Sequence, residues 1–393
     1  MSQRTSQDTT EETPVVSGAE QKRKQTSGDS DRSVADRGRA LWARAMAHTG
    51  ARHLIFALAA FVVVVVVIES TSDFASFEMT RFGYYAIAAA GLTVLTGING
   101  QLSLGHGAFM AVGAYTAALL LTDDRATPLL LVLVASVLTT LVVGALVGVA
   151  AARLSGPYIA GATLALAIAA TQVPLAVRSL GGEQGLTLGS VDVPTWVADV
   201  HFFILGRELS TNQYLAYLTW IVLIVVFVML ANLKSSRVGR RWAAVRDDEV
   251  AAELVGIDLG KDRVVAFVVS CGAAGIAGAF LALATSLAAP GNFRLELSLL
   301  LLTAIVLGGL GTLSGALIGA ALLTYLPGYA TDAGAALGLS SLKAAEIAPL
   351  VFGAVMVVVI LLAPSGLMGE VLRRRAVRRA VKRAKAAETP KTA

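Results

Sequence analysis

The sequence has little of what soluble enzymes are built from. Among its 393 residues there is one cysteine, Cys271, which excludes a disulfide framework and a CxxC metal site. Four histidines are scattered along the chain, so the sequence offers no cluster of zinc ligands. Charged residues make up 15%, against about 25% in an average soluble protein. Hydrophobic residues make up 55% and the mean hydropathy is +0.70, which excludes an ordinary soluble globular protein.

Motifs for nucleotide chemistry and for hydrolysis are missing from the sequence as well. The string nearest to a Walker A motif runs from Gly256 to Asp262, and both its spacing and its last residue are wrong. There is no HExxH zinc motif and no GxSxG nucleophile motif. We therefore expect no catalytic residues and no cofactor in this chain, and we rank a membrane enzyme acting on lipid as the third reading.

Ionisable residues are scarce inside the apolar parts of the chain. Between Phe82 and Leu121, for example, the only candidate is His106. A proton- or sodium-coupled carrier usually needs a buried carboxylate or a similar relay, although backbone carbonyls can also bind sodium. We therefore expect the energy for uphill transport to come from a partner, and we rank an autonomous channel or secondary carrier second.

Long apolar runs alternate with short breaks over most of the chain. Several hold about twenty residues, the length that one helix needs to cross a bilayer. The runs are Leu54–Ile68, Phe82–Leu95, Leu104–Leu121, Pro128–Ala152, Tyr158–Val177, Gln213–Ala231, Val264–Leu287, Leu297–Leu307, Leu313–Leu326 and Ala348–Ala363. They predict an all-α membrane protein, a polytopic helical bundle of about ten transmembrane helices, in which the shorter runs are half-helices or re-entrant segments.

Charged residues gather at the two ends of the chain and in one central loop. Residues 1–52 predict a disordered tail, residues 53–368 a transmembrane domain and residues 369–393 a basic tail. Lys and Arg are dense in the loop 234–263, whereas acidic residues outnumber basic ones in the loop 178–210. The positive-inside rule then places both termini and the loop 234–263 in the cytoplasm. The basic tail either only fixes this orientation or also lies along anionic lipid.

Two segments depart from plain apolar spans, and the first is Thr96–Phe109. It contains four glycines and the polar residues Asn99, Gln101, Ser103 and His106. Irregular backbone at membrane depth is tolerated only where protein or a watery cavity satisfies its polar groups. The pattern indicates a translocation pathway or an interhelical contact, and the alternative is a tight turn at the membrane surface.

The second segment, Gly239–Leu254, lies in the predicted cytoplasmic loop. It is free of proline and rich in helix formers, and Gly256 follows as a C-terminal stop, so we predict one short amphipathic helix. With small Ala251 and Ala252 on its surface, this helix would dock in a groove on another protein. The alternative is a helix that is only solvated at the membrane interface.

The second half of the transmembrane domain repeats a pattern of the first. Gly97–Gly105 precedes an alanine-rich span, and Gly308–Gly315 precedes another. By our count, the spans just ahead of them both run from outside to inside. These repeats are therefore parallel at this point unless one short run is re-entrant, and an inverted repeat is not established.

Together these motifs resemble the permease family of branched-chain amino-acid ABC importers. The match follows the longer, M-type subunit of the high-affinity leucine/isoleucine/valine importer and runs from about Phe82 to Gly369. In chain order it is carried by Ala89, Gly91-Leu92, Thr96-Gly97, Gly100–Phe109, Gly113–Tyr115, Gly181-Gly182, Gly185-Leu186, Gly239–Arg241, Ala244, Arg246-Asp247, Ala251-Ala252, Gly256-Ile257, Lys261, Ala266-Phe267, Ala274–Ala279, Gly308–Thr312, Gly315, Gly319-Ala320, Pro364 and Gly366-Leu367.

The resemblance implies an ABC-importer permease fold, a location and a set of partners. The chain would lie in a bacterial cytoplasmic membrane, with the lipid bilayer around it and no nucleic acid bound. It would act with two cytosolic ABC ATPase subunits, a second permease subunit of the same family and an extracytoplasmic solute-binding protein. Transport would proceed by alternating access, and the solute would be a branched-chain amino acid, or urea or a short amide in related permeases.

The resemblance also implies roles for individual residues. Coupling to the ATPase would involve Arg241, Arg246, Glu249, Ala251, Ala252 and Gly256. Among these, the alanines would allow close approach, Arg246 and Glu249 would pair with the partner, and Gly256 would end the helix. The translocation pathway would be bordered by Asn99, Gln101, Ser103 and His106.

Overall fold

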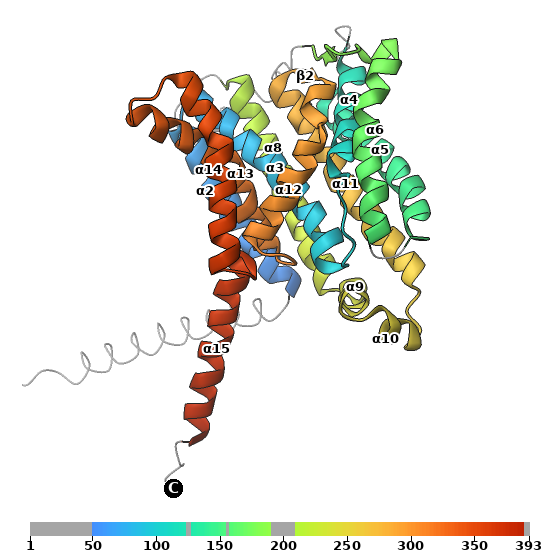
Figure 1. The fold of residues 1–393 in the computed structure, drawn as a ribbon, viewed down its shortest axis with the longest axis vertical. Helices are drawn as coiled ribbons and strands as arrows, with labels where there is room; N and C mark the ends of the chain where they lie inside the picture. The colour runs from blue at the N-terminus through green and yellow to red at the C-terminus, as the bar shows by residue number, and fades with distance from the viewer. Residues whose placement is uncertain (1–48, 123–126, 155–156, 190–208, 389–393) are drawn as a thin grey trace, which may run out of the picture. The chain divides into compact units, whose positions relative to one another are not determined.

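The computed structural model describes residues 49–122, 127–154, 157–189 and 209–388 (Figure 1). The chain separates into two units, Met1–Ile55 and Phe56–Ala393. Of the first unit, the structure describes residues 49–55, which form the start of the first helix. The predicted tail 1–52 lies outside the described residues up to residue 48, and its last four residues, Thr49–Arg52, are helical rather than disordered.

Nearly all described residues are helical. The elements are α2 (Thr49–Ser70), α3 (Asp73–Leu92), η1 (Thr93–Ile98), α4 (His106–Leu121), α5 (Leu129–Ala151), α6 (Pro157–Ala176), η2 (Arg178–Leu180), β1 (Leu186–Thr187), α8 (Thr211–Ser235), α9 (Arg237–Asp247), α10 (Glu249–Leu254), α11 (Leu259–Thr285), β2 (Leu287–Ala288), η3 (Pro290–Phe293), α12 (Leu295–Gly308), α13 (Leu313–Ala336), α14 (Ser341–Leu362) and α15 (Gly366–Glu388). The two short strands pair antiparallel, with Leu186 opposite Ala288.

Within the described residues, seven helices are long and apolar enough to cross a membrane. They confirm the predicted class, an all-α polytopic membrane protein. The first three predicted runs also form helices, namely α2, α3 with η1, and α4. Of these, α2 and α4 contribute only shorter apolar stretches, Ala57–Ser70 and His106–Leu121. Because residues 99–105 leave the helix before α4 begins, α4 is only 16 residues long.

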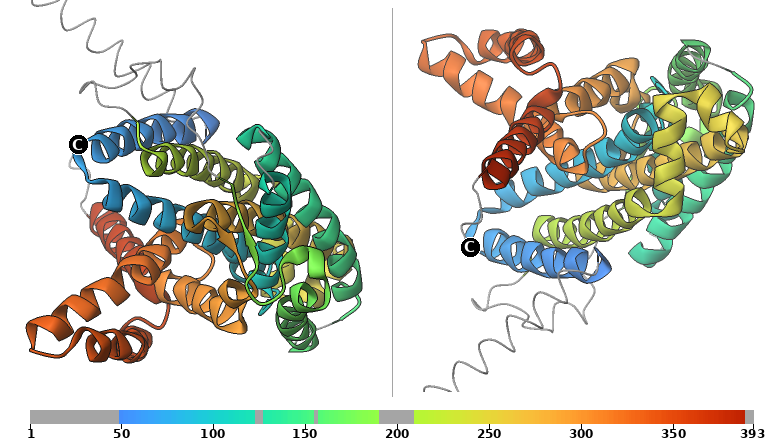
Figure 2. Two further views of the ribbon diagram at one scale, coloured as in Figure 1. Left: turned by 90° about the horizontal axis from the view of Figure 1, so that it is seen from above. Right: turned by 90° about the horizontal axis from the view of Figure 1, so that it is seen from below.

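Helix α11 is the central helix of this bundle, and α3, α4 and α5 pack around it (Figures 1 and 2). Its glycines form the small-residue face that lets neighbouring backbones approach closely. A Cβ atom on Gly278 would lie 1.8 Å from the carbonyl oxygen of Met110 in α4. A Cβ atom on Gly113 of α4 would lie 2.1 Å from the carbonyl oxygen of Gly275. The crossing of α4 over α11 is therefore possible only with glycine at these positions.

A second set of contacts joins α3 to α8 and α13 on the other side of α11. The ring of Phe82 in α3 stacks on Trp220 of α8 and on Tyr325 of α13, at centroid distances of 5.3 Å and 6.2 Å. Offset aromatic pairs of this kind stabilise a contact beyond the area that they bury. Helix α3 thus links the two sides of the bundle, and the end of α3 is where the polar segment begins.

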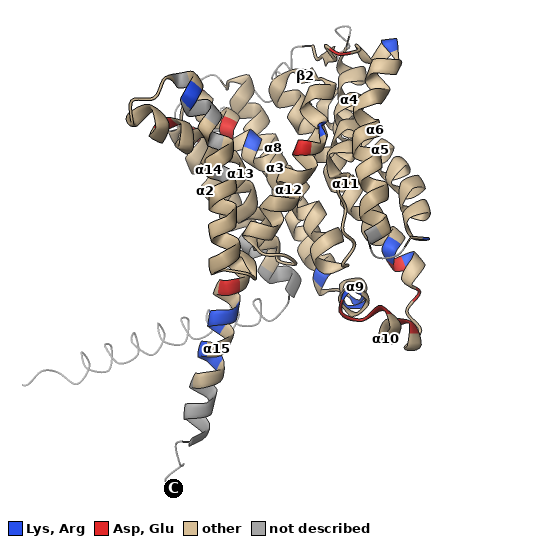
Figure 3. Cartoon of the chain, viewed as in Figure 1, with Lys and Arg blue, Asp and Glu red and all other residues tan. Residues whose placement is uncertain are grey.

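The two ends of the bundle differ in charge and structure. Helices α9 and α10 lie at one end together with the protruding α15, and the β1–β2 pair lies at the other (Figure 1). Figure 3 shows Lys and Arg gathered on α9, on α15 and at the start of α11. The loop 234–263 and the basic tail, which the charge pattern predicts on one side of the membrane, therefore lie at the same end.

We expect Gly278→Ala to destabilise the bundle by about 1–3 kcal/mol, because an added methyl group must push α4 away from α11. The control is Gly161→Ala in α6, since no atom lies within 4 Å of a Cβ at that position. Thermal unfolding of the purified chain in nanodiscs measures the difference. Equal melting temperatures for the two variants would contradict the close α4–α11 contact.

Candidate coupling surface

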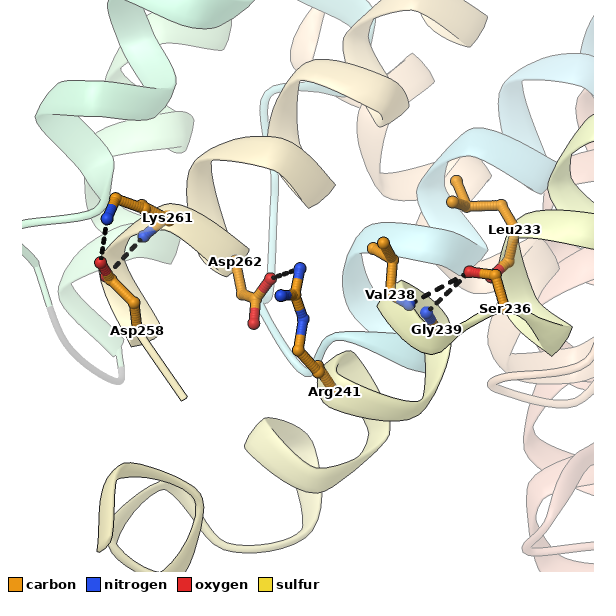
Figure 4. Close-up of polar contacts among 8 residues, drawn as sticks. All are labelled: Leu233, Ser236, Val238, Gly239, Arg241, Asp258, Lys261 and Asp262. Atoms are coloured by element: carbon orange, nitrogen blue, oxygen red, sulfur yellow. Dashed lines mark hydrogen bonds and ion pairs between the residues drawn. The ribbon is translucent and has the colours of Figure 1, made fainter. Parts of the chain in front are cut away.

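Helix α9 is held against the end of the bundle by its apolar side. Trp242 and Val245, three residues apart on one face, are both fully buried. The helix begins at Ser236, whose Oγ accepts hydrogen bonds from the backbone N–H groups of Val238 and Gly239 at 3.1 Å and 3.4 Å (Figure 4). A hydroxyl at this position satisfies N–H groups that have no partner within the helix. The chain therefore turns sharply from α8 into a docked helix.

The loop contains two helices, so the prediction of a single helix from Gly239 to Leu254 is wrong. Asp248 has an extended backbone (φ −160°, ψ 109°), which ends α9. Its carboxylate then accepts a hydrogen bond from the N–H of Ala251 at 3.0 Å and so caps the start of α10. Aspartate favours such capping positions over helix interiors. The segment was predicted as one continuous helix because it contains no proline to mark the break.

Gly256 lies two residues beyond the end of α10, where the chain needs a left-handed backbone. Its φ is +84°, and a Cβ at that position would meet no other atom within 4 Å. Glycine is therefore required here by the backbone conformation and not by lack of space. This position agrees with the predicted helix stop.

Two adjacent charges at the start of α11 hold the two loop helices. Asp262 pairs with Arg241 of α9 at 2.9 Å, and Arg263 pairs with Glu249 of α10 at 2.6 Å (Figure 4 shows the first pair). Asp262 and Arg263 are only 3% and 8% exposed, so both pairs are shielded on one side from water. Arg241 and Glu249, predicted to act in coupling, are thus engaged within the chain.

Helix α11 is itself capped in the loop just before these two charges. The carboxylate of Asp258 accepts a hydrogen bond from the N–H of Lys261 at 3.0 Å and pairs with its ammonium group at 2.9 Å (Figure 4). These interactions with Lys261 lower the pKa of Asp258 below its usual value, so the cap stays ionised at neutral pH. The start of α11, and with it the position of the two charges, is fixed locally.

The two predicted alanines have different surroundings. Ala251 is exposed, as expected, but Ala252 is only 2% exposed, so the prediction that both lie on the surface is wrong. Ala252 faces the rest of the chain because it occupies the side of α10 opposite the apolar tip. This tip consists of Val250, Leu254 and Val255, which are 69%, 83% and 78% exposed. This tip was not predicted from the sequence, although large apolar residues in a charged loop are a usable signal.

The predicted pathway residues Asn99, Gln101, Ser103 and His106 are all buried. These four side chains therefore pack inside the protein, whereas Leu102 between them is 41% exposed. Gln101 donates hydrogen bonds from its amide nitrogen to the Asn99 side chain and, at 3.1 Å, to the backbone carbonyl of Arg263. The polar segment thus contacts the start of α11, close to the charges that hold α9 and α10.

Helix α9 also contacts the same segment, through Arg246. The guanidinium Nη1 of Arg246 donates a hydrogen bond to the backbone carbonyl of Gly97 at 3.0 Å. A Cβ on Gly100, whose φ is +89°, would lie 2.9 Å from the Arg246 side chain. Arg246 therefore contacts the polar segment, while its side chain remains 42% exposed. The structure brings the two segments singled out in the sequence into direct contact.

Fold and surface together define a helical membrane protein with a structured loop docked at one end. The chain belongs to the family of branched-chain amino acid transport system permease components, whose family model matches residues 74–360. Among the described residues there is no group of three His, Cys, Asp or Glu side chains that could hold a metal ion.

Characterised relatives carry the same description. The chain is 29% identical to the high-affinity branched-chain amino acid transport system permease protein LivM of Escherichia coli K12, over 76% of this chain and 70% of the relative. It is 26% identical to the permease protein BraD of Pseudomonas aeruginosa, over 72% and 91%. It is 28% identical to LivH of Escherichia coli K12, over 72% and 91%. These relatives are transport permeases and not enzymes. A comparison with solved structures found no match.

We expect Asp262→Asn to loosen α9 by about 1–3 kcal/mol, because a charge-assisted hydrogen bond to a buried group is lost. Faster amide hydrogen exchange in residues 240–247 of the purified chain measures this local opening. The double variant Arg241→Asp with Asp262→Arg should recover part of the protection. The control is Lys261→Ala, which removes only an exposed ion pair and keeps the backbone cap. If Asp262→Asn exchanges no faster than this control, the pair does not hold α9.

Proposed function

We propose that this chain is the membrane-spanning permease subunit of an ATP-driven importer that moves branched-chain or related amino acids into the cell. Two cytosolic ATPase subunits, a second permease subunit of the same family and an external solute-binding protein would complete the assembly. The chain would itself hydrolyse no ATP. It would alternate between access from outside and access from inside as the ATPase dimer closes and opens.

The observation that carries this proposal is the tip of α10. Three large apolar side chains, Val250, Leu254 and Val255, lie exposed on a short helix, while the opposite face of that helix is pinned to α11 by Glu249 and Arg263. An exposed apolar cluster on a fixed helix is suited to insert into a groove of another protein. The end of the bundle that carries it is also the end rich in Lys and Arg, as expected for the cytoplasmic side.

This placement supports one orientation in a bacterial cytoplasmic membrane. Helices α9, α10 and α15 would face the cytoplasm with both termini, and the β1–β2 end would face the solute-binding protein. Movement of the loop would then reach the polar segment through two hydrogen bonds, from Arg246 to Gly97 and from Gln101 to Arg263. Asn99, Gln101, Ser103 and His106 would border the path of the solute where this segment rearranges.

Uptake into proteoliposomes tests the function directly. The chain is reconstituted with the ATPase, permease and binding-protein subunits encoded beside it, and labelled leucine, isoleucine, valine, urea and a short amide are supplied in turn. ATP-dependent uptake of the amino acids supports the proposal, and uptake of urea or the amide alone assigns the chain to a related solute. Equal flux through the purified chain without ATPase would favour an autonomous channel or carrier.

We expect Leu254→Asp to weaken binding of the ATPase by about 2 kcal/mol, roughly 30-fold in Kd, because a charge replaces an apolar anchor. Co-purification and leucine uptake should both fall. The control is Leu337→Asp, since Leu337 is also 83% exposed but directly follows α13, far in sequence from the loop 234–263. Undiminished uptake with Leu254→Asp would exclude the tip as the ATPase contact.

A further inference from the structure

The two glycine-rich segments that echo each other in the sequence meet in space. The first break spans residues 97–101, from the last two residues of η1 onward, and the second follows α12 at residues 309–312. A Cβ on Gly97 would lie 2.3 Å from the amide nitrogen of Gly311, and a Cβ on Gly311 would lie 2.8 Å from the carbonyl oxygen of Gly97. The backbones of the two breaks are therefore in direct contact.

Two cations bind the carbonyl groups of these breaks, one from the last turn of α8 and one from the last turn of α9. Arg246 donates to the carbonyl of Gly97 at 3.0 Å, and the ammonium group of Lys234, in the last turn of α8, donates to the carbonyl of Gly311 at 2.5 Å. Carbonyl groups beyond a helix end lack partners within the helix, and a cation near a helix C-terminus is also favoured by the helix dipole. Each break is thus bound by one cation.

Asp247 fixes the direction of Arg246. Its carboxylate accepts hydrogen bonds from Nε and Nη2 of Arg246 at 3.0 Å and 2.7 Å. The remaining nitrogen, Nη1, is the one that reaches Gly97. Because the guanidinium group is planar and rigid, holding two of its nitrogens aims the third. A lysine in the same place keeps the charge but cannot make both contacts at once.

The second break is also contacted from the start of α15. A Cβ on Gly366, whose φ is +73°, would lie 2.4 Å from the Cα of Gly309. A single junction therefore joins the end of η1, the end of α12 and the beginning of α15. A movement of α9 that shifts this junction shifts all three helices.

We propose that Lys234 and Arg246 are positioning residues that join the two breaks into one unit, so that a movement of α8 and α9 shifts the ends of η1 and α12 together during transport. Neither residue contacts the solute in this scheme. The proposal rests on the proposed function for its transport consequences. Its structural part, the linkage between the breaks, holds or fails independently of any solute.

Hydrogen exchange of the purified chain in nanodiscs tests the linkage. The variants are Lys234→Met and Arg246→Met, and the control is Arg240→Met, whose guanidinium donates to the backbone carbonyl of Ser235 at the end of α8. We expect either variant to speed exchange in residues 96–101 and in 309–316 alike, because loosening one break frees the other. The proposal is overturned if each variant affects only the break that it contacts, or if neither differs from the control.

The transport consequence is tested in the assembled importer by the ratio of solute imported to ATP hydrolysed. In both Met variants we expect this ratio to fall about fivefold or more, with ATP hydrolysis within about twofold of the unmodified chain. Arg246→Lys should give an intermediate ratio, and the double variant should be no worse than the poorer single one, since both act on one junction. This series also covers the case in which a Met variant folds poorly, because Arg246→Lys retains the charge.

An unchanged ratio in Lys234→Met, Arg246→Met and their double variant overturns the coupling role. A parallel loss of hydrolysis and uptake also overturns it, because that result places the residues in assembly with the ATPase. Failure of the proposed function has a different signature. In that case the unmodified chain imports no amino acid with its ATPases, whereas the exchange experiment still reports the linkage.

Discussion

The close approach of backbones at glycine is the constraint on which this structure depends. Lipid offers no hydrophobic force to drive one helix against another, so helices associate by packing at short range. Gly278 and Gly113 bring α4 against α11, and Gly97 and Gly311 bring the two breaks together. The first contact sets the centre of the bundle and the second sets its end. A methyl group at these positions would meet backbone atoms, which cannot move aside as a flexible side chain can.

The polar interactions follow from this packing. Once η1 and α12 end side by side, the carbonyl groups of Gly97 and Gly311 need donors from outside their own helices. Lys234 and Arg246 supply these donors from the loop, while Asp262 and Arg263 hold the loop helices from α11. The loop is therefore bound to the bundle through several elements. The apolar tip of α10 is left as the part that points outward, and this arrangement suits a segment that passes movement between two proteins.

Several features were predictable because they depend on local pattern. Apolar runs of bilayer length predicted an all-α membrane protein. The end of the loop helix before Gly256 was also predicted, because a glycine after a helix is a local signal. The break at Asp248 was missed, because aspartate is tolerated in a helix and its capping role appears only when the chain changes direction. Ala252 was placed on the wrong side for the same reason. The contact of Arg246 with Gly97 was not predicted, because the two residues lie 149 positions apart in the chain.

Composition and the spacing of glycines determined by themselves that this chain is a bundle of membrane helices, where its irregular segments fall and which family it resembles. These properties depend on neighbouring residues and on the thickness of a bilayer. Tertiary structure alone decided which charges pair within the chain, which side chains of the loop stay exposed and that the two glycine breaks touch. Such contacts join residues far apart in sequence, and they exist only after the helices have packed.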